Sequence, residues 1–125
     1  NLSDQDVYVN VTGGVRVEEP AADLGVALAI ASALSDRPVG KGAACFGEIG
    51  LTGDVRFVPG ADRRAGELIK LGFARIIRPE KLEGRKKSRE TKPSKQADNT
   101  LSARRGEDSL LEVKTLEEAV AVALL

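Results

Sequence analysis

Histidine, methionine and tryptophan are absent from this sequence of 125 residues, and Cys45 is its single cysteine. Without histidine or a pair of cysteines the chain lacks the usual ligands of zinc, so we expect no metal site in it. One cysteine cannot form an internal disulfide, which fits a reducing compartment. No apolar run reaches the length of a membrane span and no signal-peptide pattern is present, so we expect a cytoplasmic protein without a membrane partner.

The charges are balanced overall but unevenly distributed. The stretch 81–105 contains nine lysines and arginines against three acidic residues, a net charge of +6. Because the whole chain has 19 residues of each sign, the remainder has ten basic and sixteen acidic residues, a net charge of −6. A cationic stretch can hold nucleic acid through its phosphates, and it can equally be a solvated surface insertion. It contains no aromatic residue, so base stacking is unavailable to it.

The element around which the chain is organised is a helix predicted at Ala21–Leu34. Its residues are apolar on nearly every side, which predicts a buried helix. Pro20 suits the first helical position, Glu18 and Glu19 place negative charge near the positive end of the helix dipole, and Pro38 stops the helix.

The remaining pattern predicts one mixed α/β domain over residues 1–125. Residues 80–108 are polar and almost without large apolar side chains, so we predict a mobile basic insertion there. Outside it we expect strands at Asp6–Val11, Val15–Val17, Ala43–Ile49, Val55–Val58, Phe73–Arg78 and Ser109–Val113, a helix at Ala61–Leu71, and a closing helix after a capping box of Thr115 and Glu118.

A phosphate-binding loop is not predicted. Gly40-Lys41-Gly42 suggests one, but the pattern requires glycine at the position of Ser35 and serine or threonine at the position of Gly42. An ordinary loop is therefore the favoured interpretation.

Several motifs in sequence order resemble a known family. They are Glu19-Pro20-Ala21-Ala22-Asp23, Gly47-Glu48-Ile49-Gly50-Leu51-Thr52-Gly53, Pro59-Gly60-Ala61-Asp62-Arg63-Arg64 and Leu71-Gly72-Phe73-Ala74-Arg75-Ile76-Ile77-Arg78-Pro79. Together they resemble the proteolytic domain of the Lon proteases, and most closely the Lon-like C-terminal domain of the bacterial RadA (Sms) family of DNA repair and recombination ATPases. The resemblance implies the mixed α/β fold that Lon shares with the second domain of ribosomal protein S5.

The resemblance also implies where a catalytic dyad would lie. Active Lon proteases use a serine and a lysine, whose positions fall here on Ala21 and Arg64. A methyl group cannot attack a carbonyl, and a guanidinium cannot lose its proton to act as a base. We therefore expect no catalytic residues and no enzyme activity in this domain. The alternatives are an active Lon-like serine peptidase with a displaced nucleophile, for which Ser32 and Lys70 are poor substitutes, and a purely structural oligomerisation domain.

For the whole protein, the resemblance implies a DNA-dependent ATPase that forms hexameric rings of itself and binds single-stranded or branched DNA. ATP, Mg²⁺ and Zn²⁺ would be bound only by domains upstream of this one, and no cofactor is expected in this chain. The candidate DNA-binding residues are Arg56, Arg63, Arg64, Arg85, Lys86, Lys87, Arg89, Lys92, Lys95, Arg104 and Arg105; for Arg64 the alternative is an ordinary surface arginine on an amphipathic helix.

Overall fold

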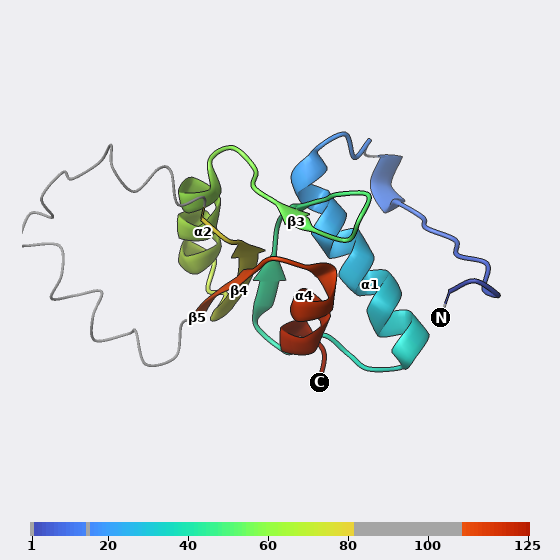
Figure 1. The fold of residues 1–125 in the computed structure, drawn as a ribbon. Coiled ribbons are helices and arrows are strands. Elements are labelled where there is room, and N and C mark those ends of the chain that lie inside the picture. The colour runs from blue at the N-terminus through green and yellow to red at the C-terminus, as the bar shows by residue number, and fades with distance from the viewer. Residues whose placement is uncertain (1, 15, 82–108) are drawn as a thin grey trace, which may run out of the picture.

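A computed structural model describes residues 2–14, 16–81 and 109–125, so most of the predicted insertion lies outside the described residues. Two short 3₁₀ helices, η1 (Thr12–Gly14) and η2 (Pro20–Ala22), come first. They are followed by α1 (Asp23–Ser35), β1 (Ala43–Cys45), β2 (Glu48–Ile49), β3 (Val55–Arg56), α2 (Ala61–Lys70), β4 (Arg75–Pro79), β5 (Ser109–Val113) and α4 (Leu116–Ala123) (Figure 1).

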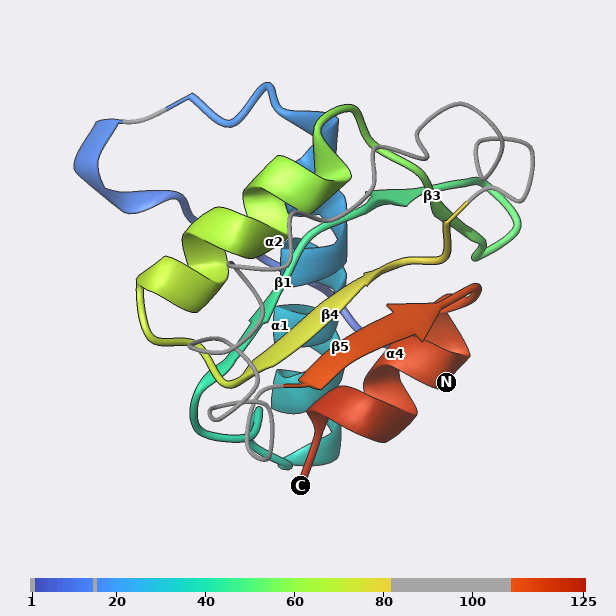
Figure 2. The same cartoon turned by 90° about the vertical axis from the view of Figure 1, so that its left-hand side faces the viewer.

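The described strands form two sheets. Three parallel strands lie in the order β1-β4-β5, with Ala44 beside Ile76 and Ile76 beside Leu110, while β2 and β3 form an antiparallel pair. The mixed α/β class is therefore confirmed, and the structure adds that its main described sheet is parallel. In a parallel sheet both faces need cover. Here α1 and α4 pack on one face and α2 packs on the other, while Leu110 of β5 is left exposed by the described residues (Figure 2).

Alternate residues of β4 divide the core between these two faces. Ile77 packs with Leu24 and Leu28 of α1, whereas Ile76 packs with Ala61 and Ala65 of α2. This alternation follows from the period of two along a strand, and it explains why a run of apolar residues was readable as a buried strand.

The beginning of α1 agrees with the sequence, but its burial does not. Pro20 opens η2, and the Glu19 side chain accepts a hydrogen bond from the Ala21 N–H. Leu24 and Leu28 are buried, yet Val26 and Leu34 are exposed, so one flank of the helix is uncovered by the described residues. The prediction of a helix buried on all sides is wrong because the sheet and α4 cover only one side of it.

Among the described residues, neither amino-terminal strand is present. Residues 6–11 are exposed and form no helix or strand, and residues 16 and 17 also lie outside any strand. The strand predicted at 43–49 divides after Cys45, since β1 pairs with β4 whereas β2 pairs with β3. The strand predicted at 55–58 is shorter, ending at Arg56.

The two later helices agree with their end signals. Gly72, which follows α2, has a φ of +94°, the left-handed conformation that glycine adopts without strain. The Thr115 side chain accepts a hydrogen bond from the Glu118 N–H at 3.2 Å, as a capping box requires. The Glu118 side chain accepts one at 2.8 Å from the N–H of Lys114, one residue before the usual donor, Thr115. The predicted capping box is therefore present in this slightly shifted form. None of the helices described here is long and apolar enough to cross a membrane.

Candidate functional site

The two positions of the expected dyad meet where η2 contacts α2. Ala21 is buried in one apolar cluster with Ala61 and Ala65 of α2. The Gly47 N–H donates to the Ala21 carbonyl at 2.9 Å, which holds η2 at the carboxyl end of β1. In open α/β sheets this end is where sites usually form. The fold therefore places Ala21 at a position from which a reactive side chain could act, but its methyl group has no such chemistry.

Arg64 is tied to the same junction. Its Nη2 lies 3.1 Å from Glu19 Oε1, and its Nε donates to the Pro59 carbonyl at 3.1 Å. Glu19 Oε1 also accepts from the Ala21 N–H at 3.3 Å. One carboxylate thus links the backbone of one dyad position to the side chain of the other. A guanidinium held in this way positions α2 against η2, and it cannot act as a general base.

The alternative nucleophile and base have other partners. Ser32 Oγ donates to the Arg37 carbonyl at 2.7 Å near the end of α1, and Lys70 Nζ lies 3.3 Å from Glu67 at the end of α2. Each contact is local to its own helix end, so the geometry offers no Ser32–Lys70 dyad.

A groove of about 610 Å³ runs beside α2 and includes the Arg64 side chain. Its apolar lining comes from Cys45, Phe46 and Leu68, and its charged lining comes from Arg63 and Arg64 together with Glu67. Burial raises the pKa of the Cys45 thiol, so the thiol is protonated and a weak nucleophile at neutral pH. The groove can hold an apolar segment next to a guanidinium, but it holds no activated nucleophile.

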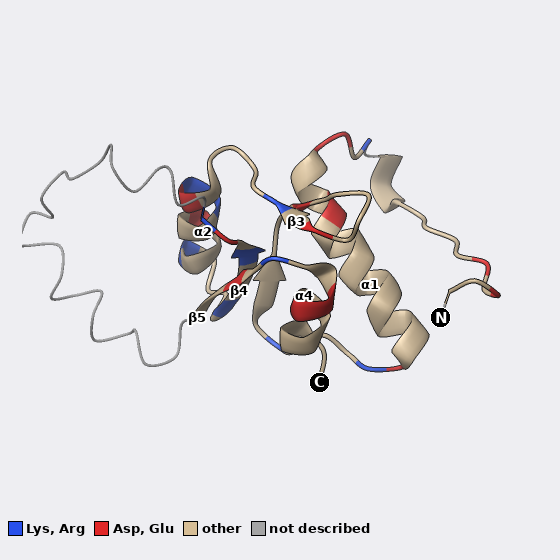
Figure 3. Ribbon diagram, viewed as in Figure 1, with Lys and Arg blue, Asp and Glu red and all other residues tan. Residues whose placement is uncertain are grey.

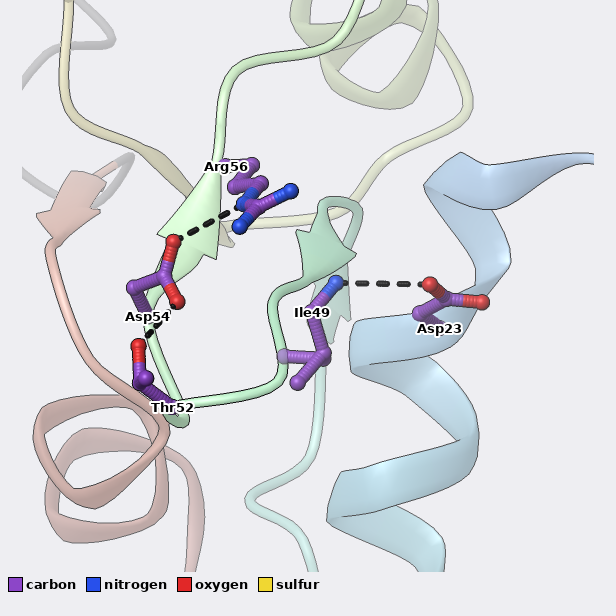
Figure 4. A network of polar contacts seen from close by, with 5 residues as sticks. All are labelled: Asp23, Ile49, Thr52, Asp54 and Arg56. Atoms are coloured by element: carbon purple, nitrogen blue, oxygen red, sulfur yellow. Dashed lines mark hydrogen bonds and ion pairs between the residues drawn. The ribbon is translucent and has the colours of Figure 1, made fainter.

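Arg56 lies in a separate polar network at the β2–β3 turn (Figure 4). Its Nε donates to Asp54 Oδ2 at 2.9 Å, and the Thr52 hydroxyl donates to Asp54 Oδ1 at 2.7 Å. Hydrogen bonds from Thr52 first, and then from Arg56, lower the pKa of the Asp54 carboxyl. Asp23 of α1 accepts from the Ile49 N–H at 3.3 Å and joins the turn to the helix.

The described candidate arginines do not all lie in one place. Arg63 and Arg64 of α2 line the groove, whereas Arg56 is paired with Asp54 on the hairpin. Arg64 pairs with Glu19 at the junction, and Arg63 is exposed and forms no ion pair with an acidic group in the described part of the chain. Figure 3 shows basic positions on several separate elements, among them α2, β3 and β4. The other candidates, Arg85, Lys86, Lys87, Arg89, Lys92, Lys95, Arg104 and Arg105, lie outside the described residues.

Sequence reasoning missed a buried charge next to this region. Arg78 of β4 is only 2% exposed, its Nη1 lies 3.1 Å from Asp62 Oδ1, and its guanidinium lies 5.9 Å from the centre of the Phe46 ring. Lys81 Nζ reaches the same carboxylate oxygen at 3.5 Å. The hydrogen bond from Arg78, ahead of the other causes, lowers the pKa of Asp62. An arginine at the end of a predicted strand is expected to be exposed, so no sequence pattern indicates that Arg78 is buried.

The described residues assemble no set of metal ligands. Within residues 2–14, 16–81 and 109–125, no group of three or more histidine, cysteine, aspartate or glutamate side chains could hold an ion.

Comparison with known proteins identifies the family. A family model described as subunit ChlI of Mg-chelatase matches residues 1–81. The chain belongs to this family. Its relatives include the DNA repair protein RadA of Halalkalibacterium halodurans, 52% identical over 80 residues, which are 64% of this chain and 18% of that protein. The RadA proteins of Salmonella typhimurium and Escherichia coli are 51% and 50% identical over 78 residues, 62% of this chain and 17% of each relative.

These relatives confirm the resemblance to RadA that the motifs predicted. The matched region spans less than a fifth of the length of each relative, so the comparison concerns one part of a longer kind of protein.

Proposed function

We propose that this chain is a Lon-like pseudo-protease domain that serves as a non-catalytic scaffold in a RadA-type DNA repair and recombination ATPase. The observation that carries the proposal is the Glu19–Arg64 pair at the junction of η2 and α2. A buried methyl group at residue 21 and a guanidinium bonded to two acceptors leave neither a nucleophile nor a base. The relatives' name, DNA repair protein RadA, supports the cellular context.

The scaffold would contribute to a hexameric ring of full-length subunits, and its basic residues would contact DNA phosphates. Arg63 is the described candidate best placed for this, because the residue is exposed and forms no ion pair with an acidic group in the described part of the chain. The net charge of +6 in residues 81–105 supports a larger contribution from that stretch. ATP hydrolysis would belong to other domains of the full-length protein.

The proposal predicts no peptide hydrolysis by this chain. Casein and fluorogenic peptides would be incubated with the wild-type chain and with the variants Ser32→Ala and Lys70→Ala. Hydrolysis that the wild type shows and either variant loses would contradict the pseudo-protease assignment in favour of a displaced nucleophile.

DNA contact is tested by a salt titration of binding to single-stranded and branched DNA. For each phosphate contact that is lost, the slope of log K against log salt should fall by about 0.7–0.9. Replacing the lysines and arginines of 81–105 with glutamine should remove most of the slope, and Arg63→Gln should remove about one contact, with Lys41→Gln as a control on an exposed loop. No binding by the wild type at low salt would leave the domain as a scaffold without DNA contact.

A further inference from the structure

The carboxyl end of β4 lies beside the first turn of α2. Because β4 follows α2 directly in the chain, the helix runs back along the strand in the opposite direction (Figure 2). Arg78, near the end of β4, reaches the helix, since its Nη1 lies 3.1 Å from Oδ1 of Asp62, the second residue of α2. In open α/β sheets ligands bind at the carboxyl ends of the strands. This junction is therefore a place where a ligand site is expected.

The first turn of α2 carries N–H groups without acceptors. Within residues 2–14, 16–81 and 109–125 no acceptor is present for the N–H groups of Ala61, Asp62 and Arg63, and Gly60, which precedes them, has no side chain to supply one. A Cβ built on Gly60 would meet nothing within 4 Å, so the space in front of the helix is open. Such a helix end attracts anions, because its N–H groups and the helix dipole present positive charge there.

A buried cation gives an independent indication of an anion at the same place. Arg78 is 2% exposed, and its Nε has no hydrogen-bond partner in the part of the chain that the structure describes. Lys81 approaches from an exposed position, with its Nζ 3.5 Å from the same Asp62 oxygen that Arg78 contacts. Arg63, on the same turn of α2, is exposed as well, and the neighbouring Glu80 pairs with Lys114 instead. Positive charge is therefore in excess around the beginning of α2.

The Asp62 carboxylate occupies the position that an external anion would take. One of its oxygens lies within reach of both Arg78 and Lys81, yet its side chain is 78% exposed. Because exposed ion pairs contribute little to stability, the carboxylate can leave these two cations at small cost. A phosphodiester that replaces it offers two unesterified oxygens, so it can accept from the cations and from the N–H groups of the helix together.

We propose that one backbone phosphate of a DNA strand binds at the first turn of α2, where it displaces the Asp62 carboxylate from Arg78 and Lys81. The inference rests on the proposed function for its choice of DNA as the source of the phosphate. It also gives a reason for a buried arginine with an unpaired donor, since binding sites commonly retain groups that lower the stability of the free protein.

NMR titration of the whole chain locates the ligand. Single-stranded oligothymidine should cause saturating shifts of the Ala61, Asp62 and Arg63 amides, whereas the amide of Lys70, at the other end of α2, should change little. Oligothymidine that binds without shifting the first-turn amides would overturn the proposal and leave DNA contact elsewhere on the chain intact. Inorganic phosphate that saturates these amides at a lower phosphate concentration than the oligonucleotide would also overturn it, because the ligand would then be a free phosphate.

Charge variants with matched controls on the same helix give a second test. At low salt Asp62→Asn should tighten oligothymidine binding by about two- to fivefold, because it removes the competing carboxylate. Glu67→Gln makes the same change of charge about 7.5 Å further along α2 and should have a clearly smaller effect. Equal effects of the two variants would contradict the site, because the charge would then act only through the general field of the chain.

Loss of the cations should have the opposite effect. Lys81→Gln should weaken oligothymidine binding by about two- to fivefold, whereas Lys70→Gln, at the far end of α2, should have a smaller effect. Arg78→Met should also weaken binding without a loss of stability in urea, so that unfolding does not explain the change. DNA binding that none of these variants alters would refute the site while the proposed DNA contact stands. If the wild-type chain binds no DNA at low salt, both fail.

Discussion

Replacing Arg78 with methionine should stabilise the domain. Arg78 is 2% exposed, and its Nε has no hydrogen-bond partner in the described structure. Its ion-pair partner, Asp62, has a side chain that is 78% exposed. The arginine has therefore lost its hydration, but it gains a partner that remains mostly in water.

The magnitudes favour the apolar side chain. An unpaired buried donor costs about 1–3 kcal/mol, and removing a charge from water adds a further penalty. Against this, an ion pair with an exposed carboxylate contributes at most about 1 kcal/mol, and the contact with the Phe46 ring at 5.9 Å contributes roughly 0.5–2 kcal/mol. Methionine fills a similar space, so we expect the free energy of unfolding to rise by about 1–2 kcal/mol.

Urea unfolding followed by far-UV circular dichroism measures this change. Lys81→Met is the matched control, because Lys81 approaches the same Asp62 oxygen from an exposed position, and its effect should stay within about 0.5 kcal/mol. A loss of more than about 1 kcal/mol in Arg78→Met, with an unchanged dependence on urea, would refute the reasoning. It would mean that the guanidinium is better satisfied than its contacts indicate.

Four further outcomes follow from the contacts described above. The pKa of Asp62 is lowered in the folded state, so its pairing with Arg78 stabilises the fold above the unfolded carboxyl pKa of about 4. This stabilisation is lost as the pH falls through the lower folded pKa. The free energy of unfolding should therefore decrease less steeply over this pH range in Arg78→Met than in the wild type. Gly47→Ala should lower the free energy of unfolding by about 1–3 kcal/mol, because the new Cβ would lie 2.9 Å from Val55 Cγ1. The control Gly66→Ala in α2, whose Cβ would meet nothing within 4 Å, should raise it by about 0.5–1 kcal/mol. Unchanged stability of Gly47→Ala in urea would show that the core relaxes around the added methyl group. Gly50→Ala should raise the pKa of Asp54, measured by NMR titration, because its Cβ would lie 2.7 Å from Arg56 Nε and displace the hydrogen-bonded pair; an unaltered titration would contradict this. Thr115→Ala should lower the unfolding free energy by about 1 kcal/mol through loss of the cap on α4, and Thr115→Ser should retain most of it.

Local signals in the sequence predicted the ends of several helices. Pro20, the capping box at Thr115 and Gly72 mark ends of η2, α4 and α2 by interactions that span only a few residues, and such interactions can be read along the chain. The placement of the expected dyad at Ala21 and Arg64 rests on the resemblance to the Lon proteases and stays a prediction.

The failures of prediction concern partners that are distant in sequence. The alternation of apolar and polar residues over 6–11 indicates that a strand could form, but it does not indicate with which strand of a sheet it would pair. The division of residues 43–49 into β1 and β2 was equally invisible, since it depends on which segment pairs with each half.

By itself the sequence determined the α/β class, several helix ends and the kinship with RadA, because each of these depends on residue identity and short-range pattern. Only the tertiary structure decided that Glu19 bonds Arg64, that Arg78 is buried against Phe46, and that one flank of α1 and one edge of β1 are left uncovered. Those facts depend on which surfaces the folded chain brings together. The Arg78–Asp62 and Glu19–Arg64 pairs join residues that are 16 and 45 positions apart, and no periodic pattern in the sequence indicates such pairs.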